Sequence, residues 1–283
     1  MTDQRQPIRL ALVRVPVAPV HREARVSSAQ TTQVPFGRVV VLRGREGEWH
    51  RVLTTPDGYE GWVHAGYLTA FDAPEFGGPE FGGPALDVPD AGGGRSAQGP
   101  ASDAVRVSLG CAVRAGGRTL RLPLGAWVRP EADVLEGEAV PLGELPVRFP
   151  REGGAVVRTA ARYFASTSYQ WGGVTPWGAD CSGFVQTVFA LHGVDLPRDA
   201  APQAAAGADA GRDLGAHAAG DLLFFSERGD GRVTHVGVAA GGGRMLHVAL
   251  GRGGFASEEL AEDEEPYVAQ LRARFVGARR VLG

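Results

Sequence analysis

Three side chains in the C-terminal half of this 283-residue sequence have the chemistry of a thiol nucleophile and its base. Cys181 opens an apolar stretch, CSGFVQTVFALHG, that is typical of a helix and ends at Gly193. A helix N-terminus carries a partial positive charge and free N–H groups, so we expect it to lower the pKa of the Cys181 thiol. The thiolate is the nucleophilic form of cysteine, which makes Cys181 a candidate catalytic residue.

His235 and His247 lie in two apolar stretches on either side of the turn sequence GGGR, a pattern that predicts two neighbouring strands. Paired strands can hold both imidazoles on one face, next to the start of the helix. His235 would then be the general base for Cys181, and His247 would hold the far ring nitrogen of His235. The sequence contains no Asn, so a Cys-His-Asn triad is excluded.

Two other interpretations fit the same residues. A cysteine at a helix start is often a small buried apolar residue. One Cys with two His is also a ligand set of catalytic zinc sites, and the spacing of Cys181, His235 and His247 does not distinguish zinc binding from thiolate chemistry. The second cysteine, Cys111, lies in the apolar run VSLGCAV, so we expect it to be buried, and we expect two free thiols.

The elements around these residues predict an α+β domain over residues 151–283. Val156, Ala160, Tyr163 and Phe164 have helical spacing, ahead of the helix that Cys181 opens. Four apolar stretches then predict an antiparallel sheet: GDLLFF, VTHVGVAAG, RMLHVAL and RARFVGARRV. The acidic stretch EELAEDEEP at 258–266 is interpreted as a solvated loop.

The N-terminal half has a different character. Residues 1–70 predict a small antiparallel barrel, because RVVVLRGREGEWHRVLTTPDGYEGWVHAGYL contains three strand-like stretches separated by GREGE and TPDG. Residues 71–103 contain a tandem EFGGP repeat and few apolar residues, which predicts a flexible linker or a long excursion. Residues 104–150 return to strand-like patterning and predict a second small β domain.

Composition excludes several mechanisms and partners. All 29 basic residues are Arg, which excludes a P-loop lysine, a Schiff-base lysine and a Ser-Lys dyad. The net charge is -3 and no basic block occurs, so we expect no nucleic-acid partner and no membrane partner. No stretch approaches about 18 consecutive apolar residues and no signal peptide is recognised, so we expect a cytoplasmic protein, or a secreted one if a leader is missing.

Five motifs between residues 169 and 247 carry a resemblance to a known family. The segments YQWGGVTPWGADCSGFVQTVFALHGVDLPRDA, GDLLFF and THVGVAAGGGRMLH resemble the NlpC-type cysteine peptidases of bacterial cell-wall turnover. The resemblance implies a papain-like catalytic core without a metal or cofactor. It implies that Cys181 is the nucleophile, His235 the base and His247 the residue that orients the base.

The same resemblance implies substrate-binding roles for further residues. Tyr169 and Trp171 would line the pocket, with the Tyr169 hydroxyl near the oxyanion. Asp180 and Ser182 would flank the nucleophile in the substrate cleft, and Asp199 would hold the free amine of the substrate. The sequence departs from the family pattern by an Ala at position 200 in place of Ser, and by two Ala at positions 239–240 in place of Tyr-Leu.

The segments REARVSSAQTTQVPFGRVVVL and GEWHRVLTTPDGYEGWVHAGYL are similar to a bacterial SH3 domain. The whole chain then resembles the γ-D-glutamyl-L-diamino-acid endopeptidases, with two SH3-like barrels ahead of the peptidase domain. That resemblance implies cleavage of murein tripeptides or tetrapeptides with a free N-terminal L-Ala. It also implies that Glu23 and Tyr59 help to recognise the terminal ammonium.

Two alternatives to this cell-wall peptide recycling enzyme are a secreted peptidoglycan hydrolase and a non-catalytic protein that binds wall peptides. Because Lys is absent, any cation that binds a substrate carboxylate must be an Arg. The sequence does not indicate which diamino acid is preferred, nor the oligomeric state.

Overall fold

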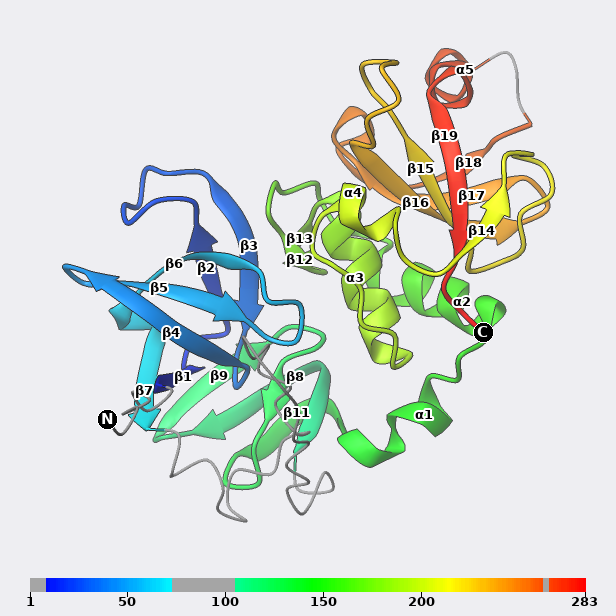
Figure 1. Ribbon diagram of the computed structural model, residues 1–283. Helices are drawn as coiled ribbons and strands as arrows, with labels where there is room; N and C mark the ends of the chain where they lie inside the picture. The colour runs from blue at the N-terminus through cyan, green and yellow to red at the C-terminus, as the bar shows by residue number, and fades with distance from the viewer. Residues whose placement is uncertain (1–8, 73–104, 262–264) are drawn as a thin grey trace, which may run out of the picture. The chain divides into compact units, whose positions relative to one another are not determined.

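The computed structural model describes residues 9–72, 105–261 and 265–283 (Figure 1). The chain forms two units, Met1–Glu144 and Leu145–Gly283. Apart from residues 71 and 72, the predicted linker at 71–103 lies outside the described residues. Among the helices in the described residues, none is long and apolar enough to cross a membrane.

The first part of the N-terminal unit is a seven-stranded antiparallel sheet in the order β3-β2-β6-β5-β4-β1-β7. Its interior is filled by small branched side chains, and Val20, Val52 and Val63 are fully buried. The three strands predicted after residue 37 are confirmed as β4, β5 and β6. The strands are β1 (Arg9–Val13), β2 (Val17–His21), β3 (Gln30–Pro35), β4 (Val39–Glu46), β5 (Trp49–Thr54), β6 (Glu60–His64) and β7 (Leu68–Asp72), with the short helix η1 (Ala65–Tyr67) before β7.

A second sheet completes this unit, with β8 between β10 and β11 and with β9 paired to β8. Cys111 on β8 is a free, buried thiol, as predicted. The two sheets share contacts: the Trp127 N–H donates to the Phe36 carbonyl at 2.8 Å, and the Arg38 guanidinium lies 4.5 Å from the Trp127 ring centroid. The second barrel therefore packs on the first within one unit, and its SH3 character stays a prediction. The elements are β8 (Arg106–Ala115), β9 (Arg118–Leu122), β10 (Trp127–Val128), β11 (Asp133–Pro141) and η4 (Leu142–Glu144).

The C-terminal unit combines helices with a six-stranded antiparallel sheet in the order β14-β19-β15-β16-β17-β18, which confirms a mixed α and β fold. Both predicted helices are present, as α2 and α3. The elements are α1 (Leu145–Arg148), α2 (Gly153–Phe164), β12 (Val174–Thr175), β13 (Gly178–Ala179), α3 (Cys181–Leu191), α4 (Ala200–Gln203), β14 (Ala208–Gly211), β15 (Leu222–Phe225), β16 (His235–Gly241), β17 (Arg244–Ala249), η5 (Leu250–Arg252), β18 (Gly254–Glu259), α5 (Pro266–Ala273) and β19 (Phe275–Arg280).

The predicted hairpin is confirmed, with β16 and β17 joined through the GGGR turn (Figure 1). Several elements of this unit were not predicted, and three of them extend or cover the sheet. The edge strands β14 and β18 extend the sheet on both sides, and α5 occupies part of the segment preceding β19. Val268 and Leu271 of α5 pack with Leu223, Phe225 and Met245 of the sheet in one buried cluster. These additions matter because β18 borders the strand that carries His247.

Candidate active site

Cys181 is buried and is the first residue of α3. The helix begins here because the preceding Asp180 has extended backbone angles and accepts the Gly183 N–H with its carboxylate at 2.8 Å. A glycine is required at position 183, since a Cβ there would lie 2.1 Å from the Gly173 carbonyl oxygen. The D-C-S-G motif thus encodes a capped helix start packed closely against the preceding loop.

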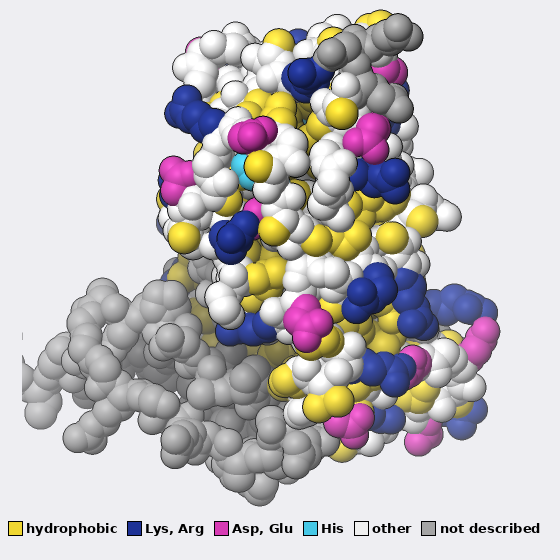
Figure 2. Space-filling view, turned by 90° about the vertical axis from the view of Figure 1, so that its right-hand side faces the viewer, with side chains coloured by type: hydrophobic (Ala, Val, Ile, Leu, Met, Phe, Trp, Pro, Cys, Tyr) yellow, Lys and Arg dark blue, Asp and Glu magenta, His cyan; other side chains and the backbone are white. Residues whose placement is uncertain are grey.

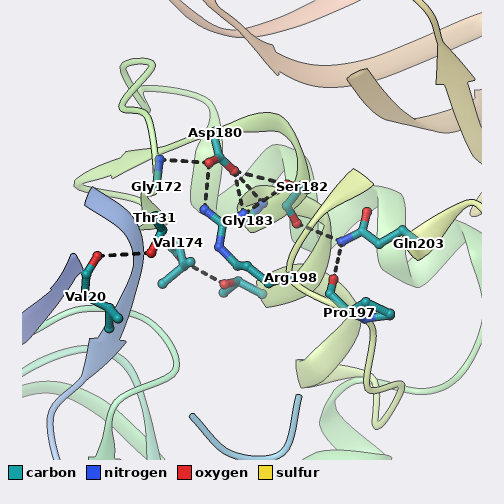
Figure 3. A network of polar contacts seen from close by, with 11 residues as sticks. Val20, Thr31, Gly172, Val174, Asp180, Ser182, Gly183, Pro197, Arg198 and Gln203 are labelled. Atoms are coloured by element: carbon teal, nitrogen blue, oxygen red, sulfur yellow. Dashed lines mark hydrogen bonds and ion pairs between the residues drawn. The ribbon is translucent and has the colours of Figure 1, made fainter. Parts of the chain in front are cut away.

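Asp180 is held in a buried network that Figure 3 shows. Arg198, whose side chain is 1% exposed, approaches the two carboxylate oxygens at 2.6 and 3.0 Å. The Gly172 N–H donates to the same carboxylate at 2.9 Å, and Arg198 also donates to the Ser182 hydroxyl at 2.9 Å. Asp180 and Ser182 therefore have a structural use inside the protein, and their predicted contact with substrate stays a prediction.

Gln203 extends this network to α4. Its side-chain amide donates to the Ser182 carbonyl at 3.1 Å and to the Pro197 carbonyl at 2.8 Å (Figure 3). The amide is fully buried. The chain around Arg198 is thereby fixed against the first turn of α3, so that residues far apart in the sequence hold Cys181 in place.

The pKa of the Cys181 thiol is raised to about 12, chiefly by burial and then by the negative charge of Asp180. The backbone N–H groups of Val236 and Ser182 act in the opposite direction but do not outweigh these two causes. The prediction that the helix start lowers this pKa was therefore wrong, because it left desolvation out. In the free protein Cys181 is a neutral thiol near pH 7.

The contact between Cys181 and the backbone of Val236 places the thiol next to His235, the first residue of β16. Both His235 and His247 are buried. Nε2 of His235 lies 2.8 Å from Nδ1 of His247. Burial, followed by the nearby His247, lowers the pKa of His235 to about 3, so this imidazole is neutral near pH 7.

A further residue, Glu258 on β18, continues the contacts beyond His247. Its carboxylate lies 3.2 Å from Nε2 of His247 and accepts two hydrogen bonds from Arg252, at 2.7 and 2.8 Å. Burial alone would raise the pKa of Glu258, but the hydrogen bonds from His247 and Arg252 lower it to about 2. Glu258 is therefore ionised over most of the pH scale.

The prediction that residues 258–266 form a solvated loop was wrong for this part of the segment. Glu258 is 4% exposed and Leu260 is 3% exposed. Glu265 caps α5 by accepting the Val268 N–H at 2.7 Å. The signal that was available is the apolar Leu260 two residues after Glu258, which is the spacing of side chains on one face of a strand.

Three further predicted site residues belong to the C-terminal unit. Tyr169 lies near the nucleophile, since its pKa is raised first by burial and then by the neighbouring Cys181 and Asp180. Trp171 is 62% exposed, and Asp199 is an exposed residue at the start of α4.

Glu23 and Tyr59 belong to the N-terminal unit. Glu23 is exposed and forms an ion pair with Arg25 at 2.7 Å. The Tyr59 N–H donates to the Thr54 hydroxyl at 3.1 Å. Their part in the site stays a prediction.

No group of three or more His, Cys, Asp and Glu side chains suited to a metal ion occurs in the described part of the chain. His247 directs both ring nitrogens at protein partners, His235 and Glu258. A zinc ion would have to displace one of these contacts. The arrangement fits proton transfer between a thiol and an imidazole better than it fits a zinc ligand set.

Charges of both signs are mixed on the surface. On the face in Figure 2, Arg side chains alternate with acidic ones and with apolar patches. This agrees with the small net charge of -3.

Two family models match the chain: NlpC/P60 over residues 166–271, and the bacterial SH3 domain over residues 16–69. A γ-D-glutamyl-L-lysine dipeptidyl-peptidase of Bacillus subtilis is 34% identical in an alignment 230 residues long, which covers 75% of this chain and 69% of that protein. The bifunctional muramidase/DL-endopeptidase CwlT of Bacillus subtilis is 42% identical over 88 residues, which are 30% of this chain and 26% of that protein.

Among solved structures, an NlpC/P60 family protein from Bacillus cereus has a TM-score of 0.70 at 20% identity. The match covers 97% of this chain and 100% of that one. At this identity the likeness shows a shared fold over both units.

Proposed function

Because the chain belongs to the NlpC/P60 family of cysteine peptidases, we propose that it hydrolyses the bond between γ-D-Glu and the diamino acid in peptidoglycan stem peptides with a free N-terminal L-Ala. The observation that carries the proposal is the buried thiol of Cys181, which contacts the backbone of Val236 directly after His235, together with the contact between His235 and His247. The relative that is 34% identical bears the name of a γ-D-glutamyl-L-lysine dipeptidyl-peptidase, which supports the choice of bond.

The first chemical step joins proton transfer to bond formation. The Cys181 thiol gives its proton to His235 as the sulfur attacks the carbonyl carbon of the γ-D-Glu amide. The tetrahedral intermediate carries its negative charge on the former carbonyl oxygen. Tyr169 and the backbone N–H groups at the start of α3 are the donors we assign to this oxygen.

The intermediate collapses when the amide C–N bond breaks. The leaving amine of the diamino acid takes the proton from His235, and a thioester between Cys181 and the γ-carboxyl group of D-Glu remains. Water then gives a proton to His235 and attacks the thioester. Release of L-Ala-D-Glu returns the proton to the Cys181 sulfur and restores the neutral pair.

Recognition of the free N-terminus is assigned to Asp199, with Glu23 and Tyr59 as further candidates. A hydrogen bond to a charged group contributes about 1.5–3 kcal/mol. Acylation of L-Ala would remove the ammonium and leave the carboxylates without this partner. We therefore expect released stem peptides to be good substrates and intact peptidoglycan to be a poor one.

The test compares L-Ala-γ-D-Glu-meso-diaminopimelate with its N-acetylated form, each incubated with the wild type and with Cys181→Ala. We expect cleavage of the free peptide by the wild type only, and loss of at least about 100-fold in rate on acetylation. Cleavage by Cys181→Ala would contradict the thiol mechanism. Equal rates for the free and acetylated peptides would contradict recognition of the ammonium but not the peptidase activity.

Intact peptidoglycan serves as a third substrate in the same assay. Preferential release of peptides from it would favour the secreted hydrolase over the recycling enzyme. The cytoplasmic location stays a prediction, which fractionation of cells that produce the protein would test.

A further inference from the structure

We propose that Glu258 is a positioning residue that sets the hydrogen positions on both histidines, so that His235 keeps its Nδ1 lone pair for the Cys181 proton. The expected effect of Glu258 on the reaction rate rests on the proposed function, whereas the expected hydrogen positions on the two imidazoles do not. The proposal follows from the chemistry of neutral imidazole, which carries one N–H donor and one acceptor nitrogen.

The chain of reasoning begins at the carboxylate. Arg252 donates to both oxygens of Glu258, at 2.7 and 2.8 Å, and keeps the group ionised. An ionised carboxylate can only accept hydrogen bonds. The nitrogen of His247 that faces it at 3.2 Å, Nε2, must therefore carry the hydrogen.

The consequence passes from one ring to the next. When His247 carries a single hydrogen, that hydrogen is on Nε2 and Nδ1 is an acceptor. His235 approaches that acceptor with Nε2 at 2.8 Å, so Nε2 of His235 must be a donor. The remaining nitrogen of His235, Nδ1, then holds the lone pair. The opposite arrangement would place a hydrogen on Nδ1 and leave His235 unable to accept a proton there.

The groups around Glu258 support this assignment. Glu265 forms an ion pair with Arg252 at 3.1 Å, and the Arg252 guanidinium lies 4.2 Å from the Tyr267 ring centroid. The Tyr267 ring is 6.1 Å from that of His247, and its pKa is raised to about 12, by burial and then by Glu258, so it adds no charge near neutral pH. Arg252 is thus held in place by Glu265 and Tyr267 as well as by the carboxylate of Glu258.

The direct test is ¹⁵N NMR of the imidazoles in the wild type and in Glu258→Gln. At neutral pH we expect both His235 and His247 of the wild type to be neutral with the hydrogen on Nε2. In Glu258→Gln the charge is lost and the amide can donate, so we expect a mixture of tautomers. A hydrogen on Nδ1 of His247 in the wild type would overturn the proposal, whatever the variant does.

Kinetics give the second readout. Loss of the partner that orients a metal-ligating histidine typically costs about 10–100-fold, and by analogy we expect a loss of this size in kcat for Glu258→Gln, with little change in KM. Glu258→Asp keeps the charge and should recover part of the rate. The control is Glu259→Gln, an adjacent carboxylate that pairs with Arg244 at 3.6 Å and should leave kcat unchanged. A wild-type kcat in Glu258→Gln with wild-type tautomers would overturn the proposal.

A separate observation concerns a charged hollow in the C-terminal unit, of about 160 Å³. Its charged lining residues are Asp209, Arg212 and Arg279, and Ala204, Phe224 and Val233 contribute apolar surface. Arg279 is anchored there, because its Nε donates to the Ala204 carbonyl at 2.7 Å. Among the residues that the structure describes, neither Arg212 nor Arg279 forms an ion pair.

The lining includes a residue of β15, the strand that pairs with β16. Phe224 pairs across the sheet with Val236, whose N–H contacts Cys181. Val233 precedes His235 by two residues. The strand residues that line the hollow belong to β14, β19 and β15, which precede β16 in the strand order. The Tyr169 N–H donates to the Gly253 carbonyl, directly before β18, which follows β16 in that order. The hollow and Tyr169 thus lie on opposite sides of the strand that carries His235.

We infer that this hollow takes the charged end of the diamino acid that follows the scissile bond, as a zwitterion with one carboxylate and one ammonium. Arg212 and Arg279 suit the carboxylate and Asp209 suits the ammonium. Such an end is present in meso-diaminopimelate, whereas lysine ends in an ammonium alone. The inference rests on the proposed function and adds a preference among its substrates.

The experiment measures kcat/KM for L-Ala-γ-D-Glu-meso-diaminopimelate and for L-Ala-γ-D-Glu-L-Lys. We expect the wild type to prefer the diaminopimelate peptide by about tenfold or more, the scale of a charge-assisted hydrogen bond. In Arg212→Gln the preference should fall towards one, through loss of rate on the diaminopimelate peptide. Arg244→Gln on β17, outside the hollow, is the matched control and should keep the wild-type ratio.

Equal rates on the two peptides in the wild type would overturn this inference while leaving the proposed function in place. An unchanged ratio in both Arg212→Gln and Arg279→Gln would also overturn it. Failure of the wild type to cleave either peptide would instead contradict the proposed function itself.

Discussion

Two buried polar networks meet near Cys181, and they differ in what they leave available. In the first, Arg198, Gly172 and Gly183 all donate to Asp180. In the second, Glu258, His247 and His235 follow one another across β18, β17 and β16. The first network is built around an ion pair between Arg198 and Asp180, whereas the second contains two imidazoles, a side chain that can accept or donate a proton.

The difference separates support from chemistry. A buried carboxylate that accepts hydrogen bonds from several donors is fixed in position, which makes it suitable for holding a helix start in place. Neutral imidazoles can change state during a reaction, which makes them suitable as bases. Burial alone does not distinguish the two networks, because Asp180 and His247 are both buried. The two networks are distinguished by the identity and the number of the groups that bond to these residues.

The largest expected effect comes from breaking the histidine network at its first member. His235→Gln removes the base, and we expect kcat/KM to fall by about 10²–10⁴-fold. The free energy of unfolding should change much less, because no buried charge is left without a partner. Steady-state kinetics and urea unfolding measure the two quantities. His50→Gln in the N-terminal unit is the control, and a similar loss of rate there would contradict the assignment.

Breaking the Asp180 network should affect stability instead. Arg198→Leu leaves the Asp180 carboxylate buried without its cation, a change that typically costs about 3–5 kcal/mol in the free energy of unfolding. The exposed pair of Arg121 and Glu136, 3.4 Å apart, provides the control. Arg121→Leu should cost under about 1 kcal/mol. Unchanged urea unfolding of Arg198→Leu would show that the network is not structural.

A third expected effect is a pH dependence of stability. The pKa of His235 is lowered from 6.5 to about 3 on folding, so the unfolded chain binds more protons between these values. Stability should therefore fall as the pH is lowered from 6.5 towards 3, with the melting temperature decreasing by about 10 °C. His235→Gln should flatten this part of the curve. An equally steep decrease in that variant would assign the effect to other groups.

Glu258 contributes at lower pH, with the same sign. Its pKa is lowered from 4.5 to about 2, so its contribution to stability is present above pH 4.5 and is lost as the pH falls towards 2. The two windows overlap between about pH 4.5 and 3, so melting curves above pH 4.5 test the His235 contribution and curves below pH 3 test that of Glu258.

Several features were accessible from the sequence for local reasons. The helix start at Cys181 is encoded by a capping Asp180 followed by an apolar run, both within one short segment. The strands that carry His235 and His247 are marked by apolar runs on either side of a glycine turn. The family motifs contain all three residues, which is why the family could be recognised before the fold was known.

Other features depend on contacts between distant segments. Glu258 lies in an acidic run that looks solvated, and only the pairing of β18 with β17 brings it to His247. Arg198 reaches Asp180 from 18 residues further along the chain. Neither contact leaves a periodic signal in the sequence, because each depends on where a strand or loop packs.

The sequence by itself was enough to recognise the family and to single out Cys181, His235 and His247 as the predicted catalytic residues, since both follow from residue types at short range. The tertiary structure decided the protonation of the site. Burial makes Cys181 and His235 a neutral pair, although the helix start alone predicted a thiolate. Desolvation depends on everything that surrounds a group, so it cannot be obtained from the residues next to it in the chain.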